Sequence, residues 1–448
     1  MRILKYGILV CVLGFFGFQT QAQKVLTLEN CLDIAMENNI DLKRAQNNAL
    51  IARSNQLQAM MGFLPSLEAR TNYDFFFGTF FDTNAARQVS STTRSSNPNV
   101  RTNLTLFNGM ANHHRVKARW HDSEAVENSI EEQKLNVRAT ILGAYLNVVL
   151  DKENIKISEK RMVLLEAQLD REIKRESVGV GNLEQVYNFK SQLANEKLNQ
   201  VNLTNRLKSD RLILLQALGI KDTNGYEVEA YDFQEIEFTQ PVGTYEDILG
   251  MSVAYSPSIK RARAENLASS YGLKIARASY LPTVSAFGLF GSNYSSNGAL
   301  NPETGAFEPN AGFFDQLAFN EFKYFNISLS IPIFSNWRNK NQVQVAKINF
   351  LNSELDLKQA ELTMNNTVQQ VYLDLIAAHS TYKAAEENLI ALNQSFEFVS
   401  TRYEQGNTDF FTYLESLNNL NRAEIELINA KYSIVFRKKI LDVYKGIY

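Results

Sequence analysis

The chain has 448 residues, of which 45% are hydrophobic and 21% are charged, and its formal net charge is −2. This slightly acidic balance argues against a nucleic acid as partner, because proteins that bind nucleic acids carry a basic surface. With only two cysteines, the chain cannot be built around a framework of disulfides.

The N-terminus has the pattern of a secretory signal peptide. Arg2 and Lys5 form a basic start, residues 8–18 are apolar, and Thr20–Ala22 offers a small-residue cleavage site. The alternative, a membrane anchor, is disfavoured because the apolar stretch is too short to span a bilayer. Removal of residues 1–22 leaves 44 basic and 48 acidic residues, a formal charge of −4. We therefore expect an exported protein, and no later apolar run is long enough for a transmembrane helix.

The sequence repeats itself at long range. Lys43-Arg44-Ala45 recurs 217 residues later as Lys260-Arg261-Ala262, and further along the chain the spacing becomes 227. The matches at the second spacing are Phe107 with Phe334, Asn112 with Asn339, Tyr145-Leu146 with Tyr372-Leu373, Arg175 and Gly179 with Arg402 and Gly406, and Gly219-Ile220 with Gly446-Ile447. A period of this length indicates a duplicated architecture of domain size. We predict two structural repeats, residues 23–220 and 244–448, joined by a linker over residues 221–243.

Each repeat is predicted to begin with a helix, over residues 28–63 and 245–280, followed by two stretches that alternate apolar and polar residues. The four alternating stretches cover about residues 66–81, 99–107, 283–297 and 323–334. One apolar and one polar face over nine to twelve residues is typical of a membrane-spanning strand, although a half-buried soluble hairpin has the same local pattern. Long polar loops, residues 82–98 and 299–322, are expected to join the strands of each pair.

Four strands are too few for a closed membrane barrel, and open strand edges are not tolerated in lipid. If the strands span a membrane, several chains must therefore pool them. Two, three or four copies would give eight, twelve or sixteen strands, and physical arguments alone do not choose among these numbers.

Each repeat is predicted to end in a long helical hairpin. Residues 99–240 and 333–448 contain no proline and are rich in helix-forming residues with helical apolar spacing. The first apolar stripe runs from about Asn112 to Glu176, a helix of roughly 100 Å at 1.5 Å per residue. Coiled-coil packing is the economical explanation for helices of this length. Glycines break each tract once, and Asn182 and Asp409 are suited to cap the returning helices.

Several short motifs, most of them with a counterpart in the second repeat, together point to a family by their order and duplication. They are Leu28-Glu29-Asn30-Cys31-Leu32 with Asn38-Asn39, Phe63-Leu64-Pro65 and Tyr280-Leu281-Pro282, Leu106-Phe107-Asn108-Gly109 and Ile331-Pro332-Ile333-Phe334, and the turns that join Arg175 to Gly179 and Arg402-Tyr403 to Gly406. None is specific alone, but together they make essentially the whole mature chain resemble the TolC-like outer-membrane efflux family.

The resemblance implies a mainly α protein with membrane β-structure. A homotrimer would pool four strands per chain into a 12-stranded barrel, continued by a long coiled-coil α-barrel. The implied location is the outer membrane of a Gram-negative bacterium, with a large periplasmic portion. The implied function is the passive exit duct of a tripartite efflux or type I secretion system, and the implied partners are a periplasmic adaptor (membrane fusion) protein, an inner-membrane transporter and outer-membrane lipid.

The resemblance also implies roles for particular residues. The hairpin turns would dock the adaptor through Arg175, Gly179, Gly181, Asn182, Arg402, Gly406, Asn407 and Thr408. The polar strand faces would line the lumen with Glu68, Arg70, Asn72, Asp74, Arg101 and Asn103. Some family members narrow the pore with an acidic residue six positions after the tip glycine, but Gln185 and Thr412 occupy those positions here. The candidates for a constriction are therefore Glu184, Gln185, Asp409, Thr412 and Glu415. A simpler interpretation, that the turn residues only turn and cap the chain, stays open.

The sequence contains no pattern typical of an enzyme. It has no glycine-rich phosphate loop and no nucleophile elbow, and its four histidines lack the spacing of metal ligands. We therefore expect no catalytic site, no metal and no cofactor. The alternative to a channel is a periplasmic coiled-coil adaptor or structural tether without a pore, but such a protein needs neither amphipathic strands nor long polar loops.

Overall fold

The computed structural model describes residues 24–82, 86–90, 92–221, 225–230, 243–297, 304 and 311–447. The chain divides into two compact units that interleave along the sequence. The hairpin unit comprises residues 1–40, 134–245 and 370–448, and the sheet unit comprises residues 41–133 and 246–369. Each unit contains parts of both predicted repeats, so the duplication in the sequence does not coincide with the division in space.

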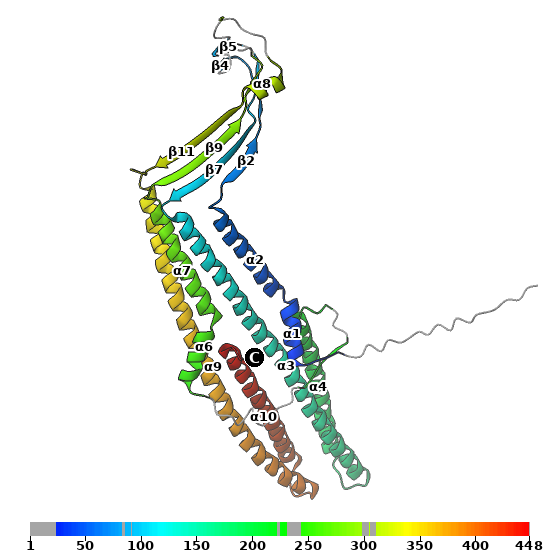
Figure 1. The fold of residues 1–448 in the computed structure, drawn as a ribbon. Coiled ribbons are helices and arrows are strands. Elements are labelled where there is room, and N and C mark those ends of the chain that lie inside the picture. Colours follow the sequence, from blue (N-terminus) through cyan, green and yellow to red (C-terminus); the bar gives the residue numbers. More distant parts are fainter. Residues whose placement is uncertain are drawn as a thin grey trace, which may run out of the picture. The chain divides into compact units, whose positions relative to one another are not determined.

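The centre of the sheet unit is a four-stranded antiparallel sheet in the order β11-β9-β7-β2 (Figure 1). Its strands are β2 (Ser66–Arg70), β7 (Asn99–Asn108), β9 (Thr283–Gly291) and β11 (Phe322–Ser330). Each repeat thus contributes two adjacent strands, and the pairing of β7 with β9 joins the repeats. A bulge after Thr105 shifts the register near the end of β7.

The pairing register gives this sheet one apolar and one more polar face, because directly paired residues point to the same side. Ala69 pairs with Val100, Val100 with Phe290, and Phe290 with Lys323. The same face includes Leu67, Thr102, Leu104, Val284, Ala286, Phe325, Ile327 and Leu329. The opposite face carries Glu68, Arg70, Arg101, Asn103, Ser285 and Ser328, together with Phe287, Leu289 and Tyr324.

Shorter elements extend the strands beyond this sheet. A three-stranded sheet has the order β10 (Tyr294–Ser295), β6 (Thr93–Ser96), β3 (Tyr73–Phe76), and β4 (Thr79–Asp82) pairs with β5 (Arg87–Ser90). The helix α8 (Phe313–Phe319) lies at the end of the four-stranded sheet away from the long helices (Figure 1).

These elements correct the two predicted polar loops, since β5 and β6 fall within residues 82–98 and α8 within residues 299–322. Residues 83–85, 91, 299–303 and 305–310 of these loops lie outside the described residues. The stretch expected as one strand over residues 66–81 is also divided. The chain changes sheets at Thr71-Asn72, where the Asn72 side chain accepts a hydrogen bond from the Asn97 backbone N–H (3.2 Å). At the other end of the sheet β11 stops at Ser330, two residues before Pro332, which has no N–H to donate.

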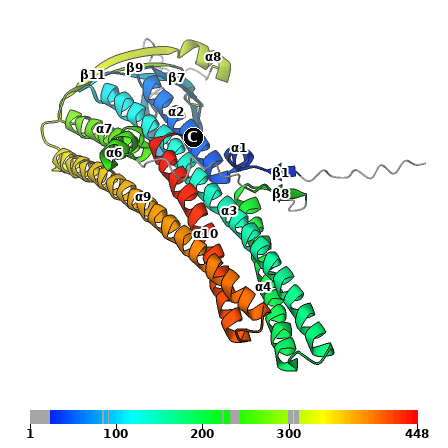
Figure 2. The same cartoon turned by 90° about the horizontal axis from the view of Figure 1, so that it is seen from below.

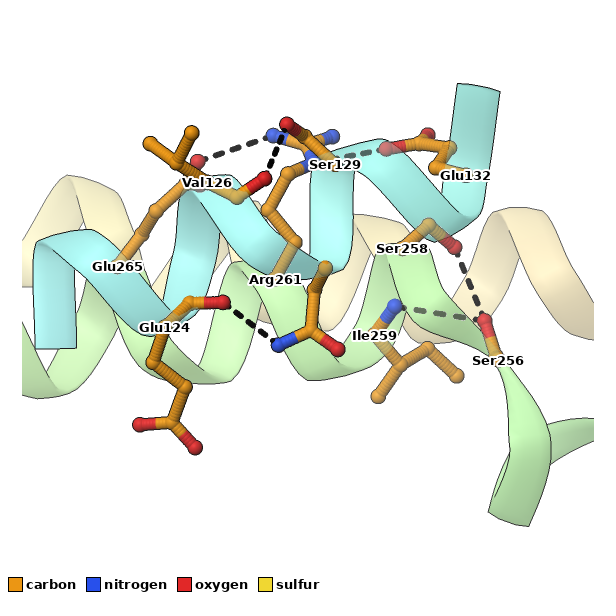
Figure 3. A network of polar contacts seen from close by, with 10 residues as sticks. Glu124, Val126, Ser129, Glu132, Ser256, Ser258, Ile259, Arg261 and Glu265 are labelled. Carbon is orange, nitrogen blue, oxygen red and sulfur yellow. Dashed lines mark hydrogen bonds and ion pairs between the residues drawn. The ribbon is translucent and has the colours of Figure 1, made fainter. Parts of the chain in front are cut away.

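Two short helices and the start of a long one pack in the sheet unit. They are α2 (Ile40–Met61), α7 (Pro257–Ala278) and the first part of α3 (Ala111–Ser177); α6 (Tyr245–Tyr255) precedes α7 and α9 (Arg338–Glu404) follows β11. Arg53 of α2 reaches Glu127 of α3 (2.8 Å), and Arg261 of α7 reaches Glu132 of α3 (2.9 Å; Figure 3). Both ion pairs are exposed enough to contribute little stability, and they help to fix how α3 meets α2 and α7.

The hairpin unit consists of two long antiparallel helix pairs and a small parallel sheet. The pairs are α3 with α4 (Leu183–Ala217) and α9 with α10 (Phe410–Lys445), and β1 (Lys24–Leu26) pairs with β8 (Tyr226–Val228). The core around α1 (Leu28–Asn38) buries Cys31, Tyr145, Val148, Leu214, Leu218 and Tyr432. The helix predicted over residues 28–63 is two helices, because Asn39 leaves the helical backbone at ψ 123°. Within the described residues, no helix combines the length and apolar character needed to cross a membrane.

Candidate functional site at the two hairpin turns

The two hairpin turns use the same backbone hydrogen bonds. Gly179 and Gly406 follow α3 and α9 with left-handed φ values of 79° and 76°, which glycine adopts without steric cost. Val180 N–H donates to the Arg175 carbonyl (3.0 Å), and Asn407 N–H donates to the Arg402 carbonyl (2.8 Å). This arrangement satisfies carbonyl groups that the helix end leaves unpaired. The turns lie at the same end of the hairpin unit (Figures 1 and 2).

The returning helices are capped by the residues expected from the sequence. The Asn182 side chain accepts a hydrogen bond from Glu184 N–H (2.9 Å), and Asp409 accepts from Phe411 N–H (2.8 Å) and Thr412 N–H (3.0 Å). The Thr412 hydroxyl also donates to Asp409 (2.6 Å). The hydrogen bond from the Thr412 side chain contributes most, and together with the backbone hydrogen bonds it holds the pKa of Asp409 below its ordinary value. Asp409 is therefore engaged as a helix cap.

Gly181 has no room for a side chain, whereas its counterpart in the second turn is Thr408. A Cβ at Gly181 would meet the Glu176 backbone nitrogen and lie 2.7 Å from the Arg175 carbonyl carbon. Real Cβ atoms do not approach backbone atoms this closely, so any substitution here requires the turn to shift.

The two arginines of the turns bond to different partners. Arg175 lies 3.3 Å from the Glu172 carboxylate, while Arg402 donates to the Asn407 carbonyl (3.2 Å). Glu172 is completely buried and also accepts a hydrogen bond from the Tyr403 hydroxyl (3.4 Å). Burial, assisted by the Glu172 charge, raises the pKa of Tyr403. A buried carboxylate with these partners links α3 to α9 close to the turns.

An aromatic cluster joins the two hairpins just behind their turns. Phe189 of α4 meets Phe410 of α10 edge to face at 4.8 Å, and Tyr403 stacks on Tyr413 at the same centroid distance. Leu165, Leu193 and Leu417 complete the buried cluster. Burial raises the pKa of Tyr413 to about 12, so this hydroxyl stays neutral at physiological pH. All four helices therefore pack together here.

Glu172 is not among the functional residues expected from the sequence. It follows Leu165 and Leu169 along the apolar stripe of α3, three residues after Leu169. The sequence signal that could have pointed to Glu172 is a carboxylate on the apolar side of a helix, because a buried charge needs a partner. Its partners come from α9, which the local pattern of α3 does not identify.

The first turn exposes several apolar side chains at its surface. Val178, Val180 and Leu183 are exposed, and Val180 retains 69% of its accessible surface. In the second turn Phe411 is also exposed. Exposed apolar groups that gather at one place are typical of surfaces that bind another protein.

The constriction candidates lie near the turns but have different surroundings. Glu184 and Glu415 are exposed, and Gln185 is partly buried. The Thr412 hydroxyl and the Asp409 carboxylate bond to each other. In a single chain these side chains form no ring, so a pore constriction stays a prediction.

Four of the six predicted lumen residues lie on one face of the four-stranded sheet. Glu68 pairs across the strands with Arg101 and lies 2.6 Å from its guanidinium, and Arg70 approaches the same carboxylate (3.3 Å). Asn103 pairs with Ser66 on this face. Asn72 and Asp74 lie elsewhere, because the chain leaves this sheet after Arg70 and Asp74 belongs to β3.

The fold is that of solved outer-membrane channel proteins. The outer membrane protein VceC from Vibrio cholerae superposes with a TM-score of 0.79 over 94% of this chain and 96% of its own, at 15% identity. CusC, described as forming a transmembrane channel, gives a TM-score of 0.78 over 94% and 92% of the two chains, at 16% identity. At these identities the likeness shows the fold alone.

The chain belongs to the outer membrane efflux protein family, whose model matches residues 31–220 and 248–441. The two matches lie one in each repeat. Outer membrane protein TolC of Escherichia coli (strain K12) is 23% identical over 304 residues, which are 66% of this chain. The alignment spans 58% of the length of that relative. The protein is thus an outer-membrane protein of the TolC-like family.

Proposed function

We propose that this protein is the exit duct of a tripartite efflux or type I secretion system. In this proposal three copies pool their strands into one barrel in the outer membrane, and the long hairpins continue the duct into the periplasm. Solutes pass the water-filled lumen passively, while an inner-membrane transporter supplies the energy. A periplasmic adaptor connects the two proteins.

The two outer strands of the four-stranded sheet support the trimer. In the described part of the chain β2 pairs only with β7, and β11 only with β9, so one edge of each is open. An unsatisfied backbone group costs several kcal/mol in lipid, which excludes open edges there. Pairing β2 of one copy with β11 of the next removes every edge, and three copies then give twelve strands.

The exposed apolar residues of the first hairpin turn carry the proposal for adaptor docking. Leaving Val178, Val180 and Leu183 in water is unfavourable, and a partner that covers them would gain about 25 cal/mol for each Å² of apolar surface buried. The caps and the aromatic cluster hold this turn in place before the partner arrives. A preformed surface loses less conformational entropy on binding.

The test compares Val180→Asp with Val163→Asp in cells that depend on this channel. Val180 and Val163 have nearly the same exposure, 69% and 68%, but Val163 lies within α3, away from the turn. Efflux is measured with fluorescent dyes that the wild-type protein exports, and trimer abundance is measured in the same cells. We expect Val180→Asp to lose export although its trimer abundance is normal. Val163→Asp should keep both export and trimer abundance. Unchanged export in Val180→Asp would refute docking at this turn.

A further inference from the structure

The helix α8 is attached to the sheet unit through its polar side chains. Gln316 donates to the Ser295 carbonyl (3.0 Å) and accepts from the Ser295 N–H (3.1 Å). The Ser292 hydroxyl donates to the Leu317 carbonyl (2.7 Å). Phe314 and Phe319, in contrast, retain 81% and 83% of their accessible surface. Gln316 of α8 thus bonds to the protein and Phe313 packs on Tyr294 (4.8 Å between ring centroids), while Phe314 and Phe319 stay exposed.

A pocket of about 410 Å³ lies between α8 and the apolar face of the sheet. We call it the α8 pocket. Ala69, Val100 and Phe290 belong to one row of paired residues on that face, and Leu317 of α8 lines the pocket together with them. The remaining lining residues are Arg70, Thr71, Pro98, Asn99, Gly291, Ser292 and Glu321. This volume falls within the range of sites that bind small molecules.

Lys323 lies next to the α8 pocket, which Arg70 also lines. Lys323 pairs with Phe290 in the sheet, and its Nζ lies 5.6 Å from the centre of the Phe290 ring and 3.0 Å from Glu321. On the apolar face of the four described strands it is the one charged side chain, and it retains 77% of its accessible surface. Its long stem can follow apolar surface while the ammonium group reaches a polar environment.

We propose that the α8 pocket binds one acyl chain of a phosphorylated membrane lipid, with Lys323 at the phosphate. The pocket continues the face that would meet lipid in the proposed barrel, so an acyl chain can enter it directly from the bilayer. An apolar chain suits the apolar row of the sheet that Ala69, Val100 and Phe290 form in the pocket. Because α8 lies at the end of the sheet opposite the long helices, the lipid comes from the outer leaflet.

This inference rests on the proposed placement of the sheet in the membrane. The exposed Phe314 and Phe319 agree with it, because aromatic rings accumulate where a barrel meets the membrane surface. A second copy of this chain is the other candidate for the pocket. The row of Ala69, Val100 and Phe290 lies on a broad face of the sheet, however, while a neighbouring strand would pair along an edge.

The experiment is native mass spectrometry of the full-length protein extracted from outer membranes in detergent. The particle is stripped of lipid and titrated with dipalmitoyl phosphatidylglycerol or with dipalmitoylglycerol, which lacks the phosphate. Val100→Trp fills the pocket. Leu104→Trp is the matched control, since it lies on the same strand and face but outside the pocket. Lys323→Gln removes the cation.

We expect the wild-type particle to bind one phosphatidylglycerol per chain, with dipalmitoylglycerol at least tenfold weaker. Val100→Trp should lose at least tenfold in occupancy and Leu104→Trp should match the wild type. Lys323→Gln should bind both lipids equally. Wild-type occupancy in Val100→Trp would overturn the proposal, as would equal losses in the two tryptophan variants.

Efficient crosslinking between chains through Leu317→Cys and Val100→Cys would likewise overturn the proposal, by placing a second copy in the pocket. The same spectra report the number of chains per particle. A failure of the proposed trimer is therefore distinguished from the absence of a lipid site.

Discussion

The two hairpin turns can be compared residue by residue, because equivalent positions lie 227 residues apart. Both turns have a left-handed glycine, the same hydrogen bond back to an arginine carbonyl and a side-chain cap on the returning helix. Their side-chain partners differ. Arg175 pairs with a buried carboxylate, while Arg402 bonds back to its own turn. The two turns have thus kept the same backbone geometry after duplication, while their arginine side chains bond to different partners.

The two junctions between a strand and a long helix also share their backbone geometry and differ in their residues. Gly109-Met110 and Asn336-Trp337 all have left-handed backbones, with φ between 46° and 66°. Just beyond them Asn112 donates to the Gly62 carbonyl (3.3 Å) and Asn339 to the Ser279 carbonyl (2.7 Å). For residues other than glycine this backbone costs on the order of 1 kcal/mol each, so the second junction carries more strain than the first.

The largest expected effect comes from exchanging residues between the turns. Gly181→Thr introduces the residue of the second turn where the Cβ has no room, and we expect it to destabilise the protein by on the order of 3 kcal/mol. The reverse change, Thr408→Gly, should cost only about 0.5 kcal/mol through the entropy of the unfolded chain. Chemical unfolding of both variants in detergent measures the difference. Equal effects would show that the two turns are interchangeable.

A smaller difference is expected between the two arginines. Arg175→Ala leaves the buried Glu172 carboxylate with fewer partners and should cost on the order of 2 kcal/mol. Arg402→Ala removes an exposed hydrogen bond and should change stability by less than about 0.5 kcal/mol. The double substitution Arg175→Ala with Glu172→Gln should recover part of the loss, because the buried charge is then absent. Equal stability of the two single variants would show that Arg175 does not stabilise the buried Glu172 carboxylate.

The smallest effect concerns a carboxyl group that only the first repeat has. Asp151 is fully buried beside Arg206 (3.1 Å), and its counterpart in the second repeat is Ala378. Burial first, and then the neighbouring Asp210 carboxyl group, raise the pKa of Asp151 to about 6. A carboxyl group with a raised pKa favours the folded state at low pH, and this contribution is lost as the pH rises through about 6.

As the pH rises from 4.5 to 7.5, the free energy of unfolding of Asp151→Asn should therefore increase by about 1–2 kcal/mol relative to that of the wild type. Thermal unfolding across this range measures the gain, with the exposed Asp170→Asn on the same helix as a control. Parallel pH profiles for wild type and Asp151→Asn would show that Asp151 titrates normally.

Local signals were sufficient to predict many elements of this fold. Glycine followed by a capping residue predicted both hairpin turns, since each cap is decided within a few residues. The long helices followed from proline-free tracts with helical spacing. Alternation also indicated where strands lie, although it could not show that the chain changes sheets at Thr71-Asn72. That change depends on Asn97, which lies 25 residues further along the chain.

Features that depend on distant contacts were not predicted. The helix α8 was expected to be loop, because its stability comes from Gln316 and Ser295, which are 21 residues apart. The buried Glu172 depends on Tyr403, 231 residues away, and the pairing of β7 with β9 joins the two repeats. A single sequence carries no local pattern for such pairs, so the structure was needed to find the α8 pocket and the contact between the hairpins.

The most direct test of the proposed duct is the native mass of the full-length protein extracted from outer membranes. We expect a particle of three chains that requires detergent for extraction and resists extraction by salt alone, because open strand edges must be paired in lipid. A monomer or dimer released without detergent would contradict it, and the strands would then form a sheet exposed to water.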